Sequence, residues 1–120
     1  MSQQPLLPSS GSAKISLPEE TQYAANGVVS RAVLNTDSQR VILFGFAEAQ
    51  ELSEHTTPHE ALVQVLSGEC AFGVNDQTHQ LRAGDLLYMS AGTPHWVKAT
   101  SQFSMLLTLS KTGAAKPQTD

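Results

Sequence analysis

Residues 84–95 constrain the fold of this chain more than any other segment. They run Gly-Asp-Leu-Leu-Tyr-Met-Ser-Ala-Gly-Thr-Pro-His, so that a short apolar run lies between Gly84 and Gly92 and a histidine, His95, follows a Gly-Thr-Pro turn. Glycines on both sides of an apolar run indicate a strand between two turns. A second cluster with histidines, residues 55–60, could face His95 from another strand. The pattern predicts a β-barrel with histidines that converge on a metal ion.

Length and charge limit the classes of protein to which such a site could belong. A chain of 120 residues has room for one domain with one hydrophobic core. Seven basic and eleven acidic residues give a net charge of −4, and the basic residues are scattered along the chain. We therefore expect no nucleic acid as a partner. The single cysteine, Cys70, excludes an internal disulfide and a cysteine-based zinc site, and we interpret it as a small buried hydrophobe.

Neither end of the chain has the pattern of a folded or targeting segment. Residues 1–13 are polar and turn-forming, without a basic segment followed by an apolar one, and residues 111–120 show no periodicity. No segment approaches the length of a membrane helix. We expect flexible tails at residues 1–13 and 111–120, a β-barrel domain at residues 14–110, no membrane partner and a cytoplasmic location.

Between these tails, short apolar runs alternate with turn residues, as in all-β sandwiches and barrels. We expect strands at residues 27–34, 40–46, 61–66, 70–74, 78–81, 85–89, 95–99 and 103–109, with a hairpin tip at Asn75 and Asp76. Residues 47–54 hold good helix formers but only one large apolar residue, and we interpret them as a loop. Residues 61–66 are apolar on both faces, which predicts packing partners on each side and favours a homodimer.

Over about residues 25–110 the chain resembles the small single-domain cupins of the RmlC-like superfamily. The second sequence motif of this family matches at Gly84, Gly92 and His95, with Ser90 at its proline position and Ala99 at its asparagine position. The first motif matches at two positions, His55 and Gly68. Its opening glycine, second histidine and glutamate are replaced here by Ala49, Thr57 and Ala61.

The resemblance implies an all-β fold in a single domain, a cupin-type antiparallel β-barrel or jelly roll. It also implies a dimer, since the small microbial members are generally described as dimeric barrels. Oxygenases, isomerases, decarboxylases and plain binding proteins share this scaffold, so the fold alone does not select a reaction. Half of the usual metal ligands of the family are missing from this sequence.

A divalent transition metal, here Fe, Mn, Ni or Zn, needs three or four nitrogen or oxygen ligands. His55 and His95 stand at the matched motif positions and are the first pair of candidate ligands. We expect His59 to be the third, because Pro58 shapes its loop and could turn the ring inward. Glu60 lies one residue from the family's glutamate position, and a one-residue bulge would add its carboxylate as a fourth ligand. Each residue also has an ordinary structural interpretation, as a hydrogen-bonding or surface side chain.

Two functions follow from these residues, and the sequence leaves open whether the protein is an enzyme. The first is a small metal-dependent enzyme, oxygenase-like or related, acting on a small-molecule substrate. The second is a non-catalytic cupin that binds or senses a small ligand in its barrel. A third, the sugar-nucleotide epimerase type, ranks last because only Arg82 and Lys98 lie near the motifs to hold phosphates. The number of converging metal ligands separates the first two functions.

We expect His79 at the surface. The core should hold the larger apolar side chains Trp96, Phe44, Phe46, Tyr88, Phe103 and Met105.

Overall fold

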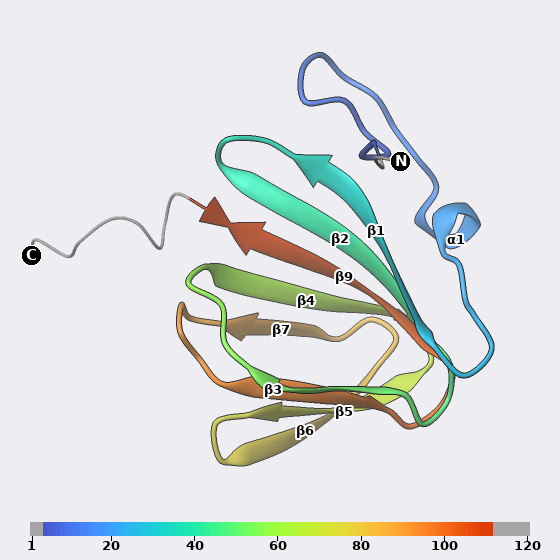
Figure 1. Cartoon of the computed structure of the whole chain (residues 1–120), viewed down its shortest axis with the longest axis vertical. Helices are drawn as coiled ribbons and strands as arrows, with labels where there is room; N and C mark the ends of the chain where they lie inside the picture. The colour runs from blue at the N-terminus through green and yellow to red at the C-terminus, as the bar shows by residue number, and fades with distance from the viewer. Residues whose placement is uncertain (1–3, 112–120) are drawn as a thin grey trace, which may run out of the picture.

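The structure is a computed structural model that describes residues 4–111 of the chain. Its elements in chain order are α1 (Leu17–Glu20), β1 (Val28–Asn35), β2 (Gln39–Phe46), β3 (Glu51–His55), β4 (Glu60–Ser67), β5 (Glu69–Val74), β6 (Gln77–Arg82), β7 (Leu86–Met89), β8 (His95–Ala99) and β9 (Phe103–Ser110). Figure 1 shows the strands as two layers that face each other. Within the described residues no helix is long and apolar enough to cross a membrane.

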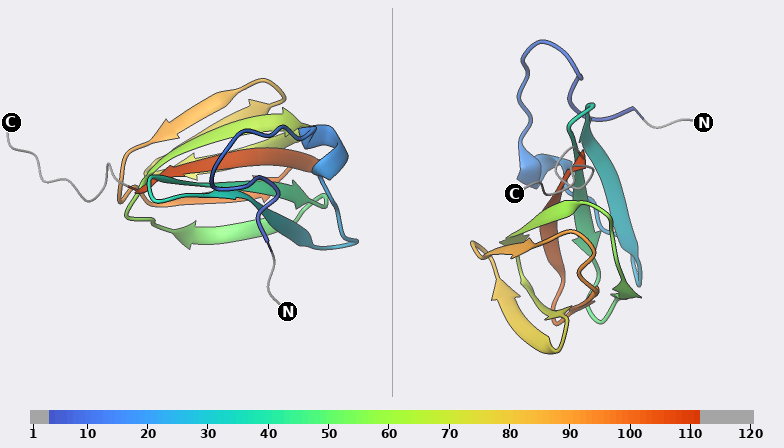
Figure 2. Two further views of the ribbon diagram at one scale, coloured as in Figure 1. Left: turned by 90° about the horizontal axis from the view of Figure 1, so that it is seen from above. Right: turned by 90° about the vertical axis from the view of Figure 1, so that its left-hand side faces the viewer.

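The strands form two antiparallel sheets. One has five strands in the order β1-β2-β9-β4-β7, and the other has four in the order β3-β8-β5-β6. Strands that are neighbours in a sheet are mostly distant in the sequence, so the chain passes repeatedly from one layer to the other, as in a jelly roll (Figure 2). The predicted all-β antiparallel barrel of the jelly-roll type is confirmed. The predicted hairpin tip is also present, since Asn75 and Asp76 connect β5 to β6.

The core lies between the inner faces of the two sheets, and strand alternation decides which residues enter it. On β4, Ala61, Val63 and Val65 are buried, whereas the side chains between them face outward. Phe46 and Phe103 are paired across β2 and β9 and are fully buried, with ring centroids 4.6 Å apart. The remaining buried members of this core are Cys70, Phe72, Leu81, Met89, Val97, Ala99 and Met105. The interpretation of Cys70 as a small buried hydrophobe is confirmed.

The two sequence motifs coincide with left-handed turns. Gly68, Gly84 and Gly92 all have φ between 75° and 96°, a backbone region that favours glycine. At Gly68 a side chain is also excluded by space, because an added Cβ would lie 2.1 Å from the carbonyl oxygen of Gln102. Ala49, which stands at the opening glycine position of the first motif, has φ 73°. It therefore keeps the turn of the missing glycine while carrying a side chain.

Part of the segment expected to be an N-terminal tail, residues 1–13, lies against the barrel. The backbone N–H groups of Leu6 and Leu7 donate to the carbonyl oxygens of Ala32 and Val33, at 3.0 and 2.7 Å. Their side chains, with those of α1, pack on the outer face of β1 and β2. This face is apolar and the outer edge of β1 has unpaired backbone groups, so the segment covers both. Residues 112–120 of the expected C-terminal tail lie outside the described residues.

Two expectations from the sequence were wrong. Residues 47–54 were expected to be a loop, but β3 occupies Glu51–His55. This strand pairs with the edge of β8, where Leu52 lies opposite Val97 and contacts the core. Its outward residues are exposed, which is why the sequence carries no clear strand pattern there. Tyr88 was expected in the core but is 56% exposed on the outer face of β7.

Candidate functional site

Two of the predicted site residues meet at one end of the barrel. β3 ends at His55 and β8 begins at His95, and the two residues are direct partners in the register between these strands. This is the end at the left of Figure 1, and it faces the viewer in the right-hand view of Figure 2. His95 belongs to the inward row of β8, since Val97 and Ala99 two and four residues later are core residues. His95 is buried, whereas His55 is exposed at the rim.

The two imidazole rings contact each other edge to face. Their centroids are 4.2 Å apart and their planes are inclined by 62°. On its other side His95 lies over the buried ring of Phe72, with a centroid distance of 6.0 Å and an angle of 14°. His95 is thus held between an aromatic side chain of the core and a second histidine at the rim. Such packing restricts the rotamers that His95 can adopt.

Both rings make the same kind of hydrogen bond to the backbone. Nδ1 of His55 bonds to the carbonyl oxygen of Ser53 at 2.7 Å, and Nδ1 of His95 bonds to that of Thr93 at 2.8 Å. A carbonyl oxygen only accepts, so each Nδ1 must carry the proton. In the neutral rings the lone pair is therefore on Nε2, which has no hydrogen-bond partner within residues 4–111. Histidines that bind metals or polar ligands are oriented by bonds of this kind.

The pKa of His95 is lowered from its ordinary value of 6.5. Burial is the main cause, because it disfavours the charged ring, and the nearby His55 lowers the pKa further. The hydrogen bond to Thr93 acts in the opposite direction but does not outweigh burial. The neutral ring, with its free lone pair on Nε2, is therefore the favoured form of His95 near neutral pH.

The other two predicted ligands are not part of this pair. His59 is half-buried in the loop before β4, and its Nδ1 is buried without a hydrogen-bond partner among the described residues. Glu60 lines a pocket on the outer face of the five-stranded sheet, together with Leu62 and Tyr88. In the part of the chain that the structure describes, no three His, Cys, Asp or Glu side chains are grouped closely enough to hold a metal ion. The roles of His59 and Glu60 as ligands stay predictions.

The side chains that meet here supply only part of the ligands that a metal ion needs. Catalytic zinc sites usually have three protein ligands, and the structure brings together two imidazoles. A firmly held ion would need one more donor, either from His59 after a movement of its loop or from a bound small molecule. The chemistry that the pair offers by itself is that of two Nε2 atoms, which in a neutral imidazole accept hydrogen bonds or protons.

A third histidine of the interior was missed by the sequence analysis. His79 was expected at the surface, but on β6 it is the register partner of the buried Phe72. It belongs to the same inward row as Leu81 and is half-buried. The alternation of His79 with the apolar Leu81 was the available signal, and a single large apolar residue was too little to assign the face.

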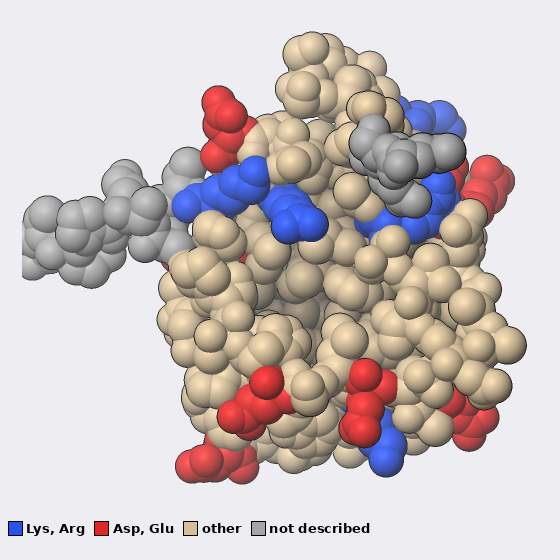
Figure 3. Space-filling view, in the orientation of Figure 1, with Lys and Arg blue, Asp and Glu red and all other residues tan. Residues whose placement is uncertain are grey.

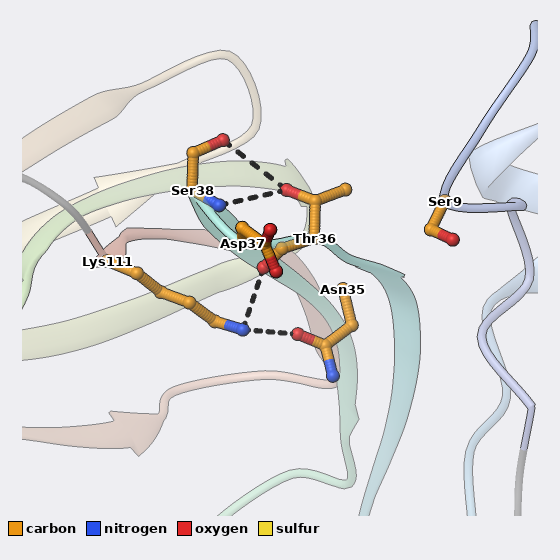
Figure 4. A pocket seen from close by; sticks show the side chains of 6 residues that line it. All are labelled: Ser9, Asn35, Thr36, Asp37, Ser38 and Lys111. Carbon is orange, nitrogen blue, oxygen red and sulfur yellow. Dashed lines mark hydrogen bonds between the residues drawn. The ribbon is translucent and has the colours of Figure 1, made fainter.

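A separate pocket lies apart from the histidine pair. It has a volume of about 520 Å³ and polar walls, formed by the turn between β1 and β2, Ser9 and Lys111. The Lys111 ammonium donates to Asn35 Oδ1 and to the carbonyl oxygen of Thr36, while Ser9 lies across the opening (Figure 4). These bonds tie the end of β9 to the turn, and we interpret the pocket as a product of that packing. Figure 3 shows charged side chains toward the borders of one face, whose centre is hollowed.

Comparison with known proteins agrees with this fold. The family described as Cupin domain matches residues 42–110. A conserved protein of unknown function from Streptococcus pyogenes is 25% identical, with a TM-score of 0.78 over 99% of this chain and 98% of that one. A cupin superfamily protein from Desulfitobacterium hafniense is also 25% identical, with a TM-score of 0.78 over 89% of this chain and 98% of that one.

A structure of salicylate 1,2-dioxygenase from Pseudoaminobacter salicylatoxidans in complex with gentisate is more distant. It is 19% identical, with a TM-score of 0.67 over 70% of this chain and 25% of that one. At this identity the likeness concerns the fold alone. The chain matches no curated protein.

Proposed function

This chain belongs to the cupin family, and on that premise we propose that it binds a small molecule at the open end of its barrel through Nε2 of His55 and His95. The observation that carries the proposal is the paired Nδ1 hydrogen bonds, at 2.7 and 2.8 Å, which direct the protons of both rings to the backbone. Two rings in contact, each with an Nε2 lone pair left for a ligand, form a ready acceptor site. A ligand with a hydroxyl, amide or other N–H or O–H donor would satisfy both.

The surroundings of the pair support binding of a partly apolar molecule. Phe72 and Val97 form the wall beside His95, and Leu52 lies on the same inward row as His55. Ligand sites typically combine apolar walls with a few oriented polar groups. The protein would act as a binding or sensing module in this proposal, with no further catalytic group required.

A second candidate is the metal-dependent enzyme, in which Fe, Mn, Ni or Zn would be held by His55, His95 and His59. The tied Nδ1 atoms support it as well, because metal-binding histidines usually donate the other ring N–H to a carbonyl or carboxylate. The metal would supply Lewis acidity or redox chemistry. We rank this candidate second because only two donors, His55 and His95, meet at the site.

We also propose a homodimer. The outer face of the five-stranded sheet is covered by the N-terminal segment over β1 and β2, whereas on β4 and β7 it exposes Leu62, Leu86 and Tyr88. The paired residues of β4, β7 and β9 on this face between Leu62 and Leu86 carry no charge. A neutral apolar face suits an identical face of a second copy better than a charged partner.

Nuclear magnetic resonance of the imidazole nitrogens tests the binding proposal directly. In the free protein we expect the Nδ1–H tautomer for both His55 and His95, and chemical-shift changes at both Nε2 atoms when a ligand from a fragment library binds. His95→Gln should remove binding, and His79→Gln, an inward histidine on another strand, should retain it. Fragments that bind without moving either Nε2 signal would contradict the site.

Metal analysis of the same protein separates the two candidates. Under the first, metal content after purification without chelators is far below one ion per chain and added ions are lost on dialysis. Retention of one ion per chain after dialysis, lost in both His55→Gln and His95→Gln, would instead establish the metal-dependent candidate.

A further inference from the structure

Strand register places one charged side chain on the inner side of the barrel. Arg40 is paired with Leu109, in the row that alternates with the outward row of Val41 and Thr108. Leu109 is a partly buried contact of the core, whereas Val41 packs under the N-terminal segment on the outside. The other charged residues with a paired register position fall on outward rows: Arg31, Glu51, Glu60, Glu69, Arg82 and Lys98. In a protein with a net charge of −4, the charge on the inward rows is positive.

Arg40 lies at the same end of the barrel as the histidine pair. Its partner Leu109 is also paired with Ala61 near the start of β4, and Ala61 is paired with Met89 at the end of β7. From Met89 the chain reaches His95 within a single loop. Figure 1 shows the start of β2, the start of β4 and the end of β7 together at this end.

The guanidinium group of Arg40 is available to a ligand. Arg40 is exposed, and it takes part in no ion pair or side-chain hydrogen bond among residues 4–111. By contrast, Arg31 on the outer face is engaged by the Glu20 carboxylate at 2.9 Å. Neighbouring strands are about 4.8 Å apart and facing sheets about 10 Å. Arg40 on the five-stranded sheet and the histidines on the four-stranded sheet thus lie on opposite walls at the same end of the barrel.

We propose that the ligand of this barrel is a small organic carboxylate with an apolar body, and that Arg40 is its counter-charge. The proposal rests on the proposed function, in which His55 and His95 contact the other end of the same molecule. Arginine binds carboxylates through two parallel hydrogen bonds, a geometry that a neutral group cannot reproduce. The half-buried Ile42 and Leu107, which follow Arg40 and Leu109 on the inward rows, would contact the apolar body.

An acid and an amide of the same shape provide the test. 4-Hydroxybenzoate and 4-hydroxybenzamide are titrated into full-length protein while the imidazole nitrogens of His55 and His95 are followed by nuclear magnetic resonance. In both probes the phenol hydroxyl can donate to the histidines, and only the acid or amide group facing Arg40 differs. Three proteins are compared: wild type, Arg40→Gln, and Arg82→Gln as a matched control. Arg82 carries the same charge on an outward row at the far end of β6.

We expect wild type to bind 4-hydroxybenzoate about tenfold more tightly than 4-hydroxybenzamide, since a charge-assisted hydrogen bond contributes at least that much. Arg40→Gln should lower the affinity for 4-hydroxybenzoate to that for 4-hydroxybenzamide, and Arg82→Gln should leave it unchanged. Equal affinity for acid and amide in wild type, or equal loss in the two variants, would overturn the role of Arg40 and leave the histidine site standing. If neither acids nor amides shift the imidazole signals, the binding proposal and the carboxylate inference both fall.

Discussion

His55 on β3 lies directly opposite His95 on β8, with the ring centroids 4.2 Å apart. Each ring donates from Nδ1 to the carbonyl oxygen of the residue two positions before it. The direction of both rings is therefore set by local backbone and not by a distant partner. Their proximity, in contrast, depends on the pairing of two strands that are 40 residues apart in the numbering of the chain.

Acidification should destabilise the protein through His95. Its folded-state pKa lies below the ordinary value of 6.5, so between these two values the unfolded chain binds more protons than the folded one. Stability is then complete above about pH 6.5 and falls as the pH is lowered through this window. We expect urea denaturation to show lower stability at pH 5.5 than at 7.5, with a smaller difference in His95→Gln. A difference as large in His95→Gln as in wild type would assign the effect to other groups.

Ala49→Gly should stabilise the protein. Ala49 has φ 73°, and a left-handed conformation costs a residue with a side chain roughly 1–2 kcal/mol. Glycine is freer in the unfolded chain, so we expect a net gain of about 0.5–1 kcal/mol in the free energy of unfolding. Ala91→Gly is the control, because Ala91 is exposed and does not have a positive φ. Equal effects at both positions would mean that the turn at Ala49 is not strained.

Cys70 should be inert in the folded protein. Burial, with a smaller contribution from the Asp85 carboxylate, raises the pKa of the Cys70 thiol to about 12. The reactive thiolate is thus disfavoured, and the side chain is fully buried. At about pH 8 we expect a thiol reagent to label Cys70 slowly in buffer. Labelling should be rapid in about 6 M guanidinium chloride, which unfolds most proteins. Fast labelling in buffer would reveal an opening of the core around β5.

Tyr88→Asp should weaken self-association. Tyr88 is 56% exposed beside Leu62, its register partner on β4, and a buried aspartate at the proposed interface would lack a partner. Sedimentation equilibrium should show a dimer for wild type and a dissociation constant raised at least about a hundredfold for the variant. Thr78→Asp, on the exposed outward row of β6, should remain dimeric. A monomeric wild type would refute the proposal.

Strand pattern made most of the fold predictable. Where a strand buries one face and has turn residues at its ends, as β4 and β5 do, its position was anticipated within a few residues. β3 was missed because its outward residues are exposed and only Leu52 reaches the core. Tyr88 was misplaced because a four-residue strand with a large side chain on each face does not show which face is covered.

The sequence by itself determined the class of fold, the glycine turns, the burial of Cys70 and the two histidines that stand at motif positions. These depend on local backbone preference and on alternation along one strand, which are encoded within a few residues. Tertiary structure decided that His55 and His95 meet while Glu60 faces outward, and that His79 and Arg40 belong to inward rows. Those outcomes depend on which distant strands pair and in what register, because a shift of one residue moves every side chain of a strand to the opposite face.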